Sequence, residues 1–191
     1  MKKIKLKKNL IINWLETFVI LFLAWIIMSG IFEFKFIFYA VVSCAVISTI
    51  CVRTLQIQAM KSDKAYFLLH INYFKLIAYM GWLLVQIIKS AWYVSVVTVK
   101  KINEMDPMVV WFKVDYDNPI AVSMLANSIT LTPGTITIDI KDGVYSVHAL
   151  TRETAEGVLD GSMQEKVAWL FGEKIHFVSL TDMTKEGTAN G

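Results

Sequence analysis

Few residues of this chain have the types and spacing that enzyme or metal chemistry requires. The three histidines, His70, His148 and His176, show no metal-ligand spacing relative to one another. Cys44 and Cys51 lie seven residues apart in an apolar run without CxxC spacing, which is typical of small, reduced, buried residues. No GxSxG, P-loop or glycine-rich dinucleotide turn occurs. We therefore expect no catalytic residue, no metal site and no cofactor.

Glu16 is the most informative single residue in the N-terminal half, because a carboxylate inside an apolar span is costly. It could take part in a proton relay, either protonated or paired. It also lies only six residues past Leu10, about 9 Å along a helix, so it could snorkel to the cytoplasmic interface or pair with a lysine. Glu16 is therefore an ion-related candidate, and we favour the structural alternative.

The segment 125–135 is the most specific stretch of the chain. Pro133 fixes φ and Gly134 permits unusual dihedral angles, which predicts a rigid, sharply bent corner between a helix and a strand. Threonine hydroxyls around the corner can bond free backbone groups. Such a corner suits docking against another protein better than binding of a phosphate, because no basic residue accompanies it. The predicted docking motif comprises Asn127, Ser128, Thr130, Thr132, Pro133, Gly134 and Thr135.

A polar and aromatic stripe follows one face of the apolar segment 71–99. Its members recur at steps of three and four residues, which places them within about 80° of one another on a helix. A helix lying flat in the headgroup plane would show this pattern, and so would a spanning helix whose stripe faces partner proteins. We favour the flat or re-entrant helix, which keeps the C-terminal region in the cytoplasm. The predicted membrane-interface stripe is Lys75, Tyr79, Trp82, Gln86, Lys89 and Tyr93.

The apolar runs of the N-terminal half predict the elements that position these residues. Of the 191 residues, 55% are hydrophobic and 18% are charged, so the chain is more apolar than a typical soluble domain. The runs 10–29 and 36–52 are long enough to cross a bilayer, and the short link between them predicts an antiparallel hairpin of transmembrane helices. Lysines before the first run and Arg53 after the second place the N-terminus and residue 53 onward in the cytoplasm.

Charge divides the chain into two halves that differ in kind. Residues 1–104 contain 13 Lys/Arg and 4 Asp/Glu, a net charge of +9, whereas residues 105–191 contain 6 and 12, a net charge of −6. We expect a membrane domain over 1–104, a small cytoplasmic α+β domain over 105–180 and a flexible tail over 181–191. The lysines next to a membrane span indicate lipid contact and not nucleic acid.

The C-terminal half alternates strand and helix patterns in the order β-α-β-β-α-(β), which is the split pattern of a ferredoxin-like sandwich. Period-two alternation predicts that Ile136, Ile138 and Ile140 face inward. Asp142-Gly143 predicts a tight hairpin turn. The expected strands are 109–114, 135–140, 144–150 and 175–178. Asp117-Asn118-Pro119 predicts a helix start, with a capping side chain and a proline in the first turn, and the helix continues over 120–128. A second helix is expected from a cap at Thr151 or Thr154 to about Phe171.

Three stretches of the sequence resemble one known family. Leu-Ala-Asn-Ser-Ile-Thr-Leu-Thr-Pro-Gly-Thr (125–135), the alternating strand after it, and Tyr145-Ser-Val-His-Ala-Leu150 closely resemble the E subunit of Mrp-type multisubunit cation/proton antiporters, also called the Mnh, Sha or Pha type. The apolar hairpin and the segment 82–92 fit the N-terminal half of that family, so the resemblance covers roughly residues 9–155. The longer lysine-rich start and the tail after about Gly172 depart from the family pattern.

The resemblance implies a function in ion transport. Subunits of this type assemble as six or seven different membrane proteins in bacteria, and the complex exchanges cytoplasmic sodium for external protons. The large subunits, which resemble proton-pumping subunits of respiratory complex I, carry the ion paths. The E subunit carries none and is needed for full antiport, with the corner Thr132, Pro133 and Gly134 as its marked feature. We therefore expect a multi-pass accessory subunit of the bacterial cell membrane, whose partners are the other antiporter subunits and the lipid bilayer.

Two alternatives are compatible with the sequence. One is the equivalent subunit of a membrane-bound hydrogenase complex, which shares this module. The identity of the partner subunits would distinguish it from an antiporter subunit. The other is a membrane-anchored enzyme acting on lipid or cell-wall precursors. Such an enzyme needs an acid/base or nucleophilic group near the membrane interface, and none stands out.

Overall fold

The computed structural model describes residues 7–60, 62, 65–67, 69, 71–100 and 105–181. The contacts divide the chain into two compact units, Met1–Ala59 with Asp63–His70, and Met60–Ser62 with Ile71–Gly191. Each unit is described by itself. His70, the lysines within residues 1–6 and all of the expected tail except Thr181 lie outside the described residues.

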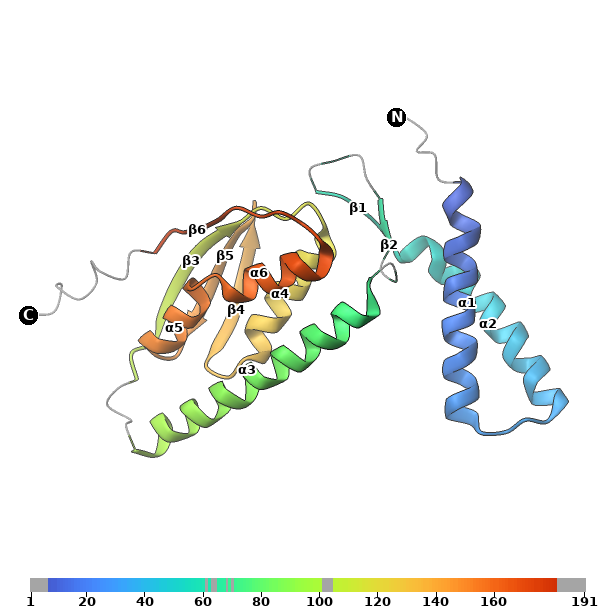
Figure 1. Ribbon diagram of the computed structural model, residues 1–191, viewed down its shortest axis with the longest axis horizontal. Coiled ribbons are helices and arrows are strands. Elements are labelled where there is room, and N and C mark those ends of the chain that lie inside the picture. The colour runs from blue at the N-terminus through green and yellow to red at the C-terminus, as the bar shows by residue number, and fades with distance from the viewer. Residues whose placement is uncertain are drawn as a thin grey trace, which may run out of the picture. The chain divides into compact units, whose positions relative to one another are not determined.

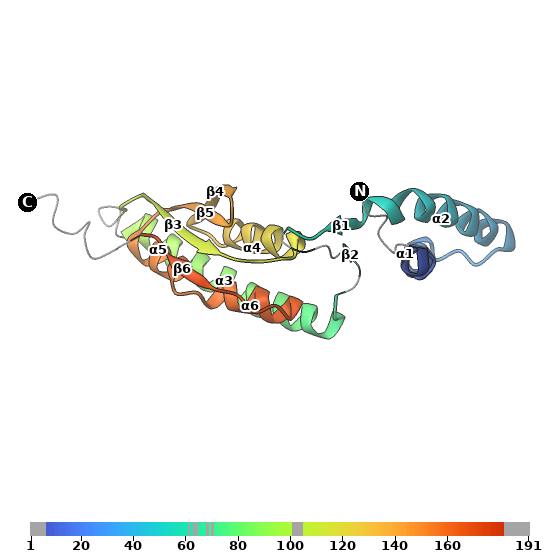
Figure 2. The ribbon, with the colours of Figure 1, turned by 90° about the horizontal axis from the view of Figure 1, so that it is seen from above.

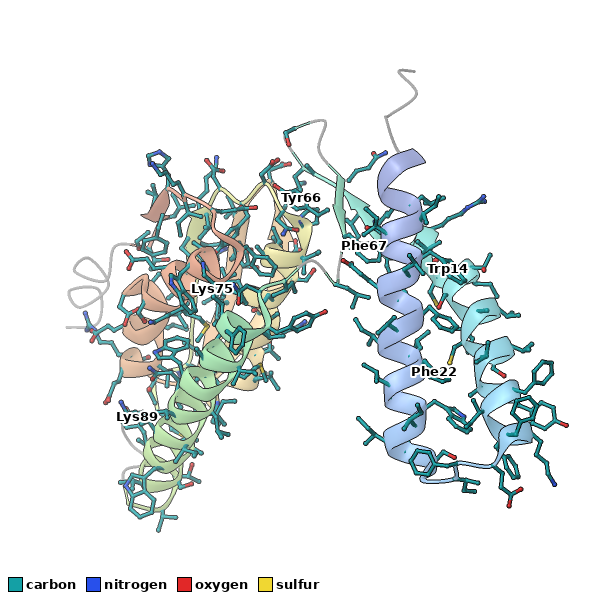
Figure 3. All side chains as sticks on the ribbon, turned by 45° about the vertical axis from the view of Figure 1, so that its right-hand side comes forward. Trp14, Phe22, Tyr66, Phe67, Lys75 and Lys89 are labelled. Atoms are coloured by element: carbon teal, nitrogen blue, oxygen red, sulfur yellow. The ribbon has the colours of Figure 1, made fainter. Side chains whose placement is uncertain are left out.

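The first unit is a hairpin of α1 (Lys7–Ser29) and α2 (Phe34–Thr54), followed by an antiparallel pair of short strands, β1 (Gln56–Gln58) and β2 (Ala65–Phe67). Residues recurring every fourth position on α2 are buried, which lets the two helices approach closely. Trp14 Nε1 donates to Thr49 Oγ1 across the hairpin at 3.1 Å, and Trp14 and Phe22 both point from α1 toward α2 (Figure 3). The expected helical hairpin is confirmed, whereas the short strand pair was not predicted. The buried positions on α2 are Ala40, Cys44, Ser48 and Val52.

The second unit contains a four-stranded antiparallel sheet in the order β4-β5-β3-β6 (Figure 1). A central first strand that pairs with the third and fourth strands is the strand order of a ferredoxin-like sandwich, so the expected fold class is confirmed. The elements are β3 (Met108–Val114), α4 (Pro119–Leu131), β4 (Thr135–Lys141), β5 (Val144–Ala149), α5 (Arg152–Leu159), α6 (Ser162–Phe171) and β6 (Phe177–Ser179).

Local sequence signals begin and end these elements. The Asn118 side chain accepts a hydrogen bond from the Ile120 backbone N–H at 3.0 Å and caps α4, with Pro119 in its first turn. Asp142 and Gly143 both have positive φ, 52° and 78°, as the tight turn between β4 and β5 requires. Thr151 caps α5 through a reciprocal pair of hydrogen bonds with Thr154. The predicted starts and turn are confirmed.

The core lies between the sheet and its helices. Alternate residues of β3 and β5 are fully buried on that side, and the Phe112 and Tyr145 rings stack with centroids 5.0 Å apart. Burial raises the pKa of Tyr145 well above its ordinary value, so its hydroxyl stays a neutral hydrogen-bond donor. This packing gives the helix layer a fixed position on the sheet.

The expected facing of β4 was partly wrong. Ile136 and Ile138 are 56% and 58% exposed on the uncovered face of the sheet, and Ile140 alone of the three packs against the core. Thr135 and Thr137 face the helices instead, and their hydroxyls donate to carbonyls of α4. A β-bulge between Thr137 and Asp139 shifts the register and reverses the phase for the rest of the strand.

The helix expected from Thr151 to about Phe171 is interrupted. It forms two helices, α5 and α6, on either side of Asp160 and Gly161. Gly161 has φ +80°, and a Cβ there would lie 3.3 Å from the ring of Phe177. The chain therefore bends where β6 crosses over it, and a side chain at this position would be both strained and crowded.

The long helix α3 (Tyr73–Lys100) packs along the α+β domain, against α4 and α6 (Figures 1 and 2). Tyr79 and Leu83 on α3 are 0% and 3% exposed and belong to the core of that domain. The compact unit accordingly begins near Ile71, and not at residue 105 where composition and charge change. Apolar composition alone groups α3 with the preceding hairpin, but its contacts group it with the sheet.

We expect the hydrogen bond between α3 and α4 to be necessary for this docking. The Tyr79 and Ser128 hydroxyls lie 2.5 Å apart in a buried site, and the Ser128 hydroxyl also donates to the Met124 carbonyl. Ser128→Ala leaves the buried Tyr79 hydroxyl without its hydrogen-bond partner and should lower the free energy of unfolding by about 1–3 kcal/mol. Tyr79→Phe should lower it by less, because the Ser128 hydroxyl keeps its hydrogen bond to the Met124 carbonyl. The measurement is the denaturation midpoint of the full chain in mild detergent. Ser95→Ala, which removes an exposed hydroxyl from the same helix, is the control, and equal midpoints for all variants would contradict the docking.

Candidate functional site: the corner and the helix it holds

The corner is built by threonine hydroxyls that satisfy the backbone where α4 ends and β4 begins. Thr132 donates to the Ser128 carbonyl at 2.9 Å, and Thr135 donates to the Ile129 carbonyl at 2.7 Å. Thr130 accepts from the Thr137 backbone N–H at 3.2 Å. The prediction that these three hydroxyls bond free backbone groups is confirmed. The helix end is therefore locked to the strand with little dependence on solvent.

Gly134 lies where three elements meet. Its carbonyl accepts from the Leu150 backbone N–H at 2.9 Å, which ties the corner to the end of β5. Its φ is +91°, and a Cβ at this position would stand 2.9 Å from Thr154 Cγ2 of α5 and 3.0 Å from Val94 Cγ2 of α3. The glycine thus permits both an unusual backbone conformation and the close approach of α3 and α5.

The stripe on α3 faces the chain's own α+β domain. The sequence suggested two other arrangements, in which the stripe faces either the lipid headgroups or partner proteins. Lys75 Nζ donates to the Trp169 carbonyl at 3.0 Å and lies 5.1 Å from the centre of the Trp169 ring. The Tyr93 hydroxyl donates to Thr151 Oγ1 at 3.3 Å. Lys89 is exposed, at the edge of this contact, and Figure 3 shows both labelled lysines of α3. The stripe residues Tyr79, Trp82, Gln86 and Tyr93 are buried or half-buried.

The structure brings the corner and the stripe together around one cavity. It has a volume of about 490 Å³ and is lined by Trp82, Lys89 and Tyr93 of α3 and by Thr132, Pro133 and Thr135 of the corner. The third wall is α5 with the start of α6, and it carries three carboxylates, Glu153, Glu156 and Asp160. Asn127 of the predicted motif is exposed on α4 and does not line this cavity.

Glu16 lies in the other unit, on α1, where it is half-buried. It is therefore not part of the cavity. Among the residues that the structure describes, no group of three or more histidine, cysteine, aspartate or glutamate side chains could hold a metal ion.

Comparison with known families decides what kind of protein carries this arrangement. A family model described as Na+/H+ ion antiporter subunit matches residues 18–169, which include most of the hairpin, all of α3 and the domain through α6. The chain belongs to this family of antiporter subunits. It is thus a component of a transporter in a multisubunit membrane complex, and three of its described helices are long and apolar enough to cross a membrane.

A solved structure also resembles this antiporter subunit. A chain of the membrane-bound sulfane sulfur reductase, an archaeal respiratory membrane complex, superposes with a TM-score of 0.57 at 24% identity. The match covers 71% of this chain and 81% of that chain. At this identity the likeness establishes the fold. The comparison with curated proteins found no match.

Sequence reasoning missed the partners of the stripe. Thr151 and Trp169 accept hydrogen bonds from α3, yet neither stands out as a partner by type or spacing. A signal did exist for the cavity wall: Glu153, Glu156 and Asp160 recur at steps of three and four, which puts three carboxylates on one side of a short helix.

Replacing Gly134 should test whether the corner holds α3. Gly134→Ala introduces both the strained φ and two contacts near 3 Å, and we expect it to lower the free energy of unfolding by roughly 2–4 kcal/mol. Gly172→Ala is a matched control, because Gly172 also has positive φ, +68°, but a Cβ there meets nothing within 4 Å. It should cost about 1–2 kcal/mol. Equal losses for the two variants, measured by chemical denaturation in detergent, would show that the contact with α3 and α5 is unimportant.

Proposed function

We propose that this antiporter subunit is an accessory subunit that assembles and stabilises a multisubunit monovalent cation/proton antiporter and carries no ion path of its own. The observation that carries the proposal is the docking of α3 along the α+β domain, because it turns an apolar helix and a polar domain into one rigid body. A hairpin of two helices gives little room for an enclosed ion path. Glu16, the carboxylate within it, has a structural role in this proposal.

Docking limits how α3 meets the membrane. Its contacts with the domain extend from Lys75, which touches Trp169, to Val94, which lies beside Gly134, about 29 Å along the helix. That length equals the thickness of the hydrocarbon core. If α3 spanned the bilayer, the exposed charges of α5 and α6 would lie in hydrocarbon, at a cost of several kcal/mol. These contacts therefore support a flat helix and argue against a spanning one.

The opposite face of α3 supports the same placement. It carries a row of exposed apolar side chains, and within that row no charge occurs. A helix with one face buried on a domain and the other apolar fits a position in the membrane surface, with its apolar face toward the acyl chains. The exposed row consists of Phe74, Ile77, Met80, Leu84, Ile88, Trp92 and Val99.

With α3 flat, the chain crosses the membrane twice, and the α+β domain lies on the cytoplasmic side with the N-terminus. The positive charge that precedes the first helix and follows the second supports this orientation. The domain then faces the cytoplasm beside the other subunits, and it can join them without being translocated.

Cysteine labelling should establish the side of the domain. In a Cys44→Ala, Cys51→Ala background, we expect Ser162→Cys, an exposed position on α6, to resist an impermeant thiol reagent in intact cells and to react in inverted vesicles. Phe32→Cys at the hairpin tip, 70% exposed, should show the reverse. Labelling of Ser162→Cys from outside would rule out the flat placement of α3.

Purification of the tagged chain in gentle detergent should recover large antiporter-like subunits. We expect Pro133→Ala, which loosens the corner, to reduce that recovery, and Glu16→Gln to change neither recovery nor antiport. Loss of antiport by Pro133→Ala with every subunit at its normal level would assign the corner to coupling. Recovery of the chain as a lone monomer would contradict the accessory role, and loss of antiport by Glu16→Gln in an intact complex would assign Glu16 to ion transfer.

A second candidate is the equivalent subunit of a respiratory membrane complex. It is favoured by the likeness to a chain of the sulfane sulfur reductase complex. The same purification separates the two, because a respiratory complex would contribute redox subunits to the recovered material.

A further inference from the structure

We propose that the cavity between α3, the corner and α5 binds the headgroup of a zwitterionic phospholipid that carries a primary ammonium, such as an ethanolamine phospholipid. The inference rests on the flat placement of α3 proposed above. It deepens that proposal by naming a lipid that the subunit recognises.

The cavity has the size and composition of a ligand site. Its volume of about 490 Å³ lies within the range of small-molecule pockets. Two aromatic side chains, Trp82 and Tyr93, and the ring of Pro133 supply apolar surface, and Gln86, Thr132 and Ser90 supply neutral polar groups. Such a mixed wall suits a ligand that is polar at one end and apolar at the other.

Charge is distributed unevenly over the cavity wall. Glu153, Glu156 and Asp160 line the α5 side, and all three are exposed. Arg152 lies 3.6 Å from Glu156 and offsets part of that charge. Lys89, on α3, is the lysine among the lining residues. An ammonium therefore fits toward α5, and a phosphate fits toward Lys89.

The position of Lys89 distinguishes a lipid from a soluble zwitterion. On α3 it follows Ile88 directly and lies one turn from Val85 and Trp92, which belong to or flank the exposed apolar row. A phosphate bound there would have its acyl chains beside that row, where a flat helix contacts the bilayer. The charges thus orient the headgroup, and the apolar row accommodates the chains.

Native mass spectrometry of the full chain in detergent tests the site directly. The probes are phosphatidylethanolamine, phosphatidylcholine and phosphatidylglycerol with identical acyl chains. Phosphatidylethanolamine should form the most adducts, because choline has no N–H donor and glycerol has no positive charge. Lys89→Gln, and the double variant Glu153→Gln with Asp160→Asn, should each reduce its binding about fivefold. Lys113→Gln and Glu165→Gln, exposed charge removals away from the cavity, are the matched controls and should change nothing.

Several outcomes would overturn the proposal. They are equal binding of the three lipids, equal binding by the variants and the controls, and displacement of the lipid by soluble phosphoethanolamine at equal concentration. If the variants lose a protein partner and keep the lipid preference, the cavity instead holds a basic segment of another subunit. The labelling experiment distinguishes the failure of this inference from the failure of the proposed topology. If Ser162→Cys is labelled from the cytoplasmic side and the three lipids bind equally, only this inference fails. If Ser162→Cys is labelled from outside, the flat placement of α3 fails.

Discussion

The contact between α3 and the α+β domain is the constraint on which the rest of the second unit depends. A helix of this hydropathy would ordinarily enter the bilayer. Here Tyr79 and Leu83 are inserted into the core of a ferredoxin-like domain, and Val94 closes over Gly134. Removing α3 would uncover those core positions, and detaching the domain would uncover the stripe. Neither part is complete alone, so the helix and the domain must be treated as one body with one apolar face.

This constraint explains why the corner is rigid. The last turn of α4, the first residue of β4 and the end of β5 are all tied there by hydrogen bonds shorter than 3 Å. A loose corner would let α4 shift against α3 and separate the buried hydroxyl pair of Tyr79 and Ser128. The threonine hydroxyls bond to backbone groups within the chain. They therefore contribute to contact with another protein by keeping the surface of the corner rigid. The sequence suggested direct docking through these residues, and that role stays a prediction.

Much of the fold could be predicted because its signals are local. Capping at Asn118-Pro119, the turn at Asp142-Gly143 and the two uninterrupted apolar runs of the hairpin each depend on a few neighbouring residues. The facing of β4 was mispredicted because Ile136 and Ile138 alternate with threonines, so either phase satisfies a period of two. The choice is made by α4, whose carbonyls accept from the threonine hydroxyls, and by a bulge with no sequence signature. The docking of α3 was missed for a similar reason, since its partners are scattered over α4, α5 and α6.

The stripe shows how one pattern can carry two physical meanings. Lysines and aromatic residues at helical spacing are typical of a membrane interface, because each combines an apolar body with a polar tip. The same property suits the border between a helix and its own soluble domain, as Lys75 on Trp169 and Tyr93 on Thr151 illustrate. What separates the two cases is the face opposite the stripe. A purely soluble helix would be polar there, whereas α3 exposes a row of apolar side chains from Phe74 to Val99 and no charge in that row. Both faces of α3 must therefore be covered. The α+β domain covers one face, and the bilayer surface covers the other. This arrangement places no charge of the domain in hydrocarbon.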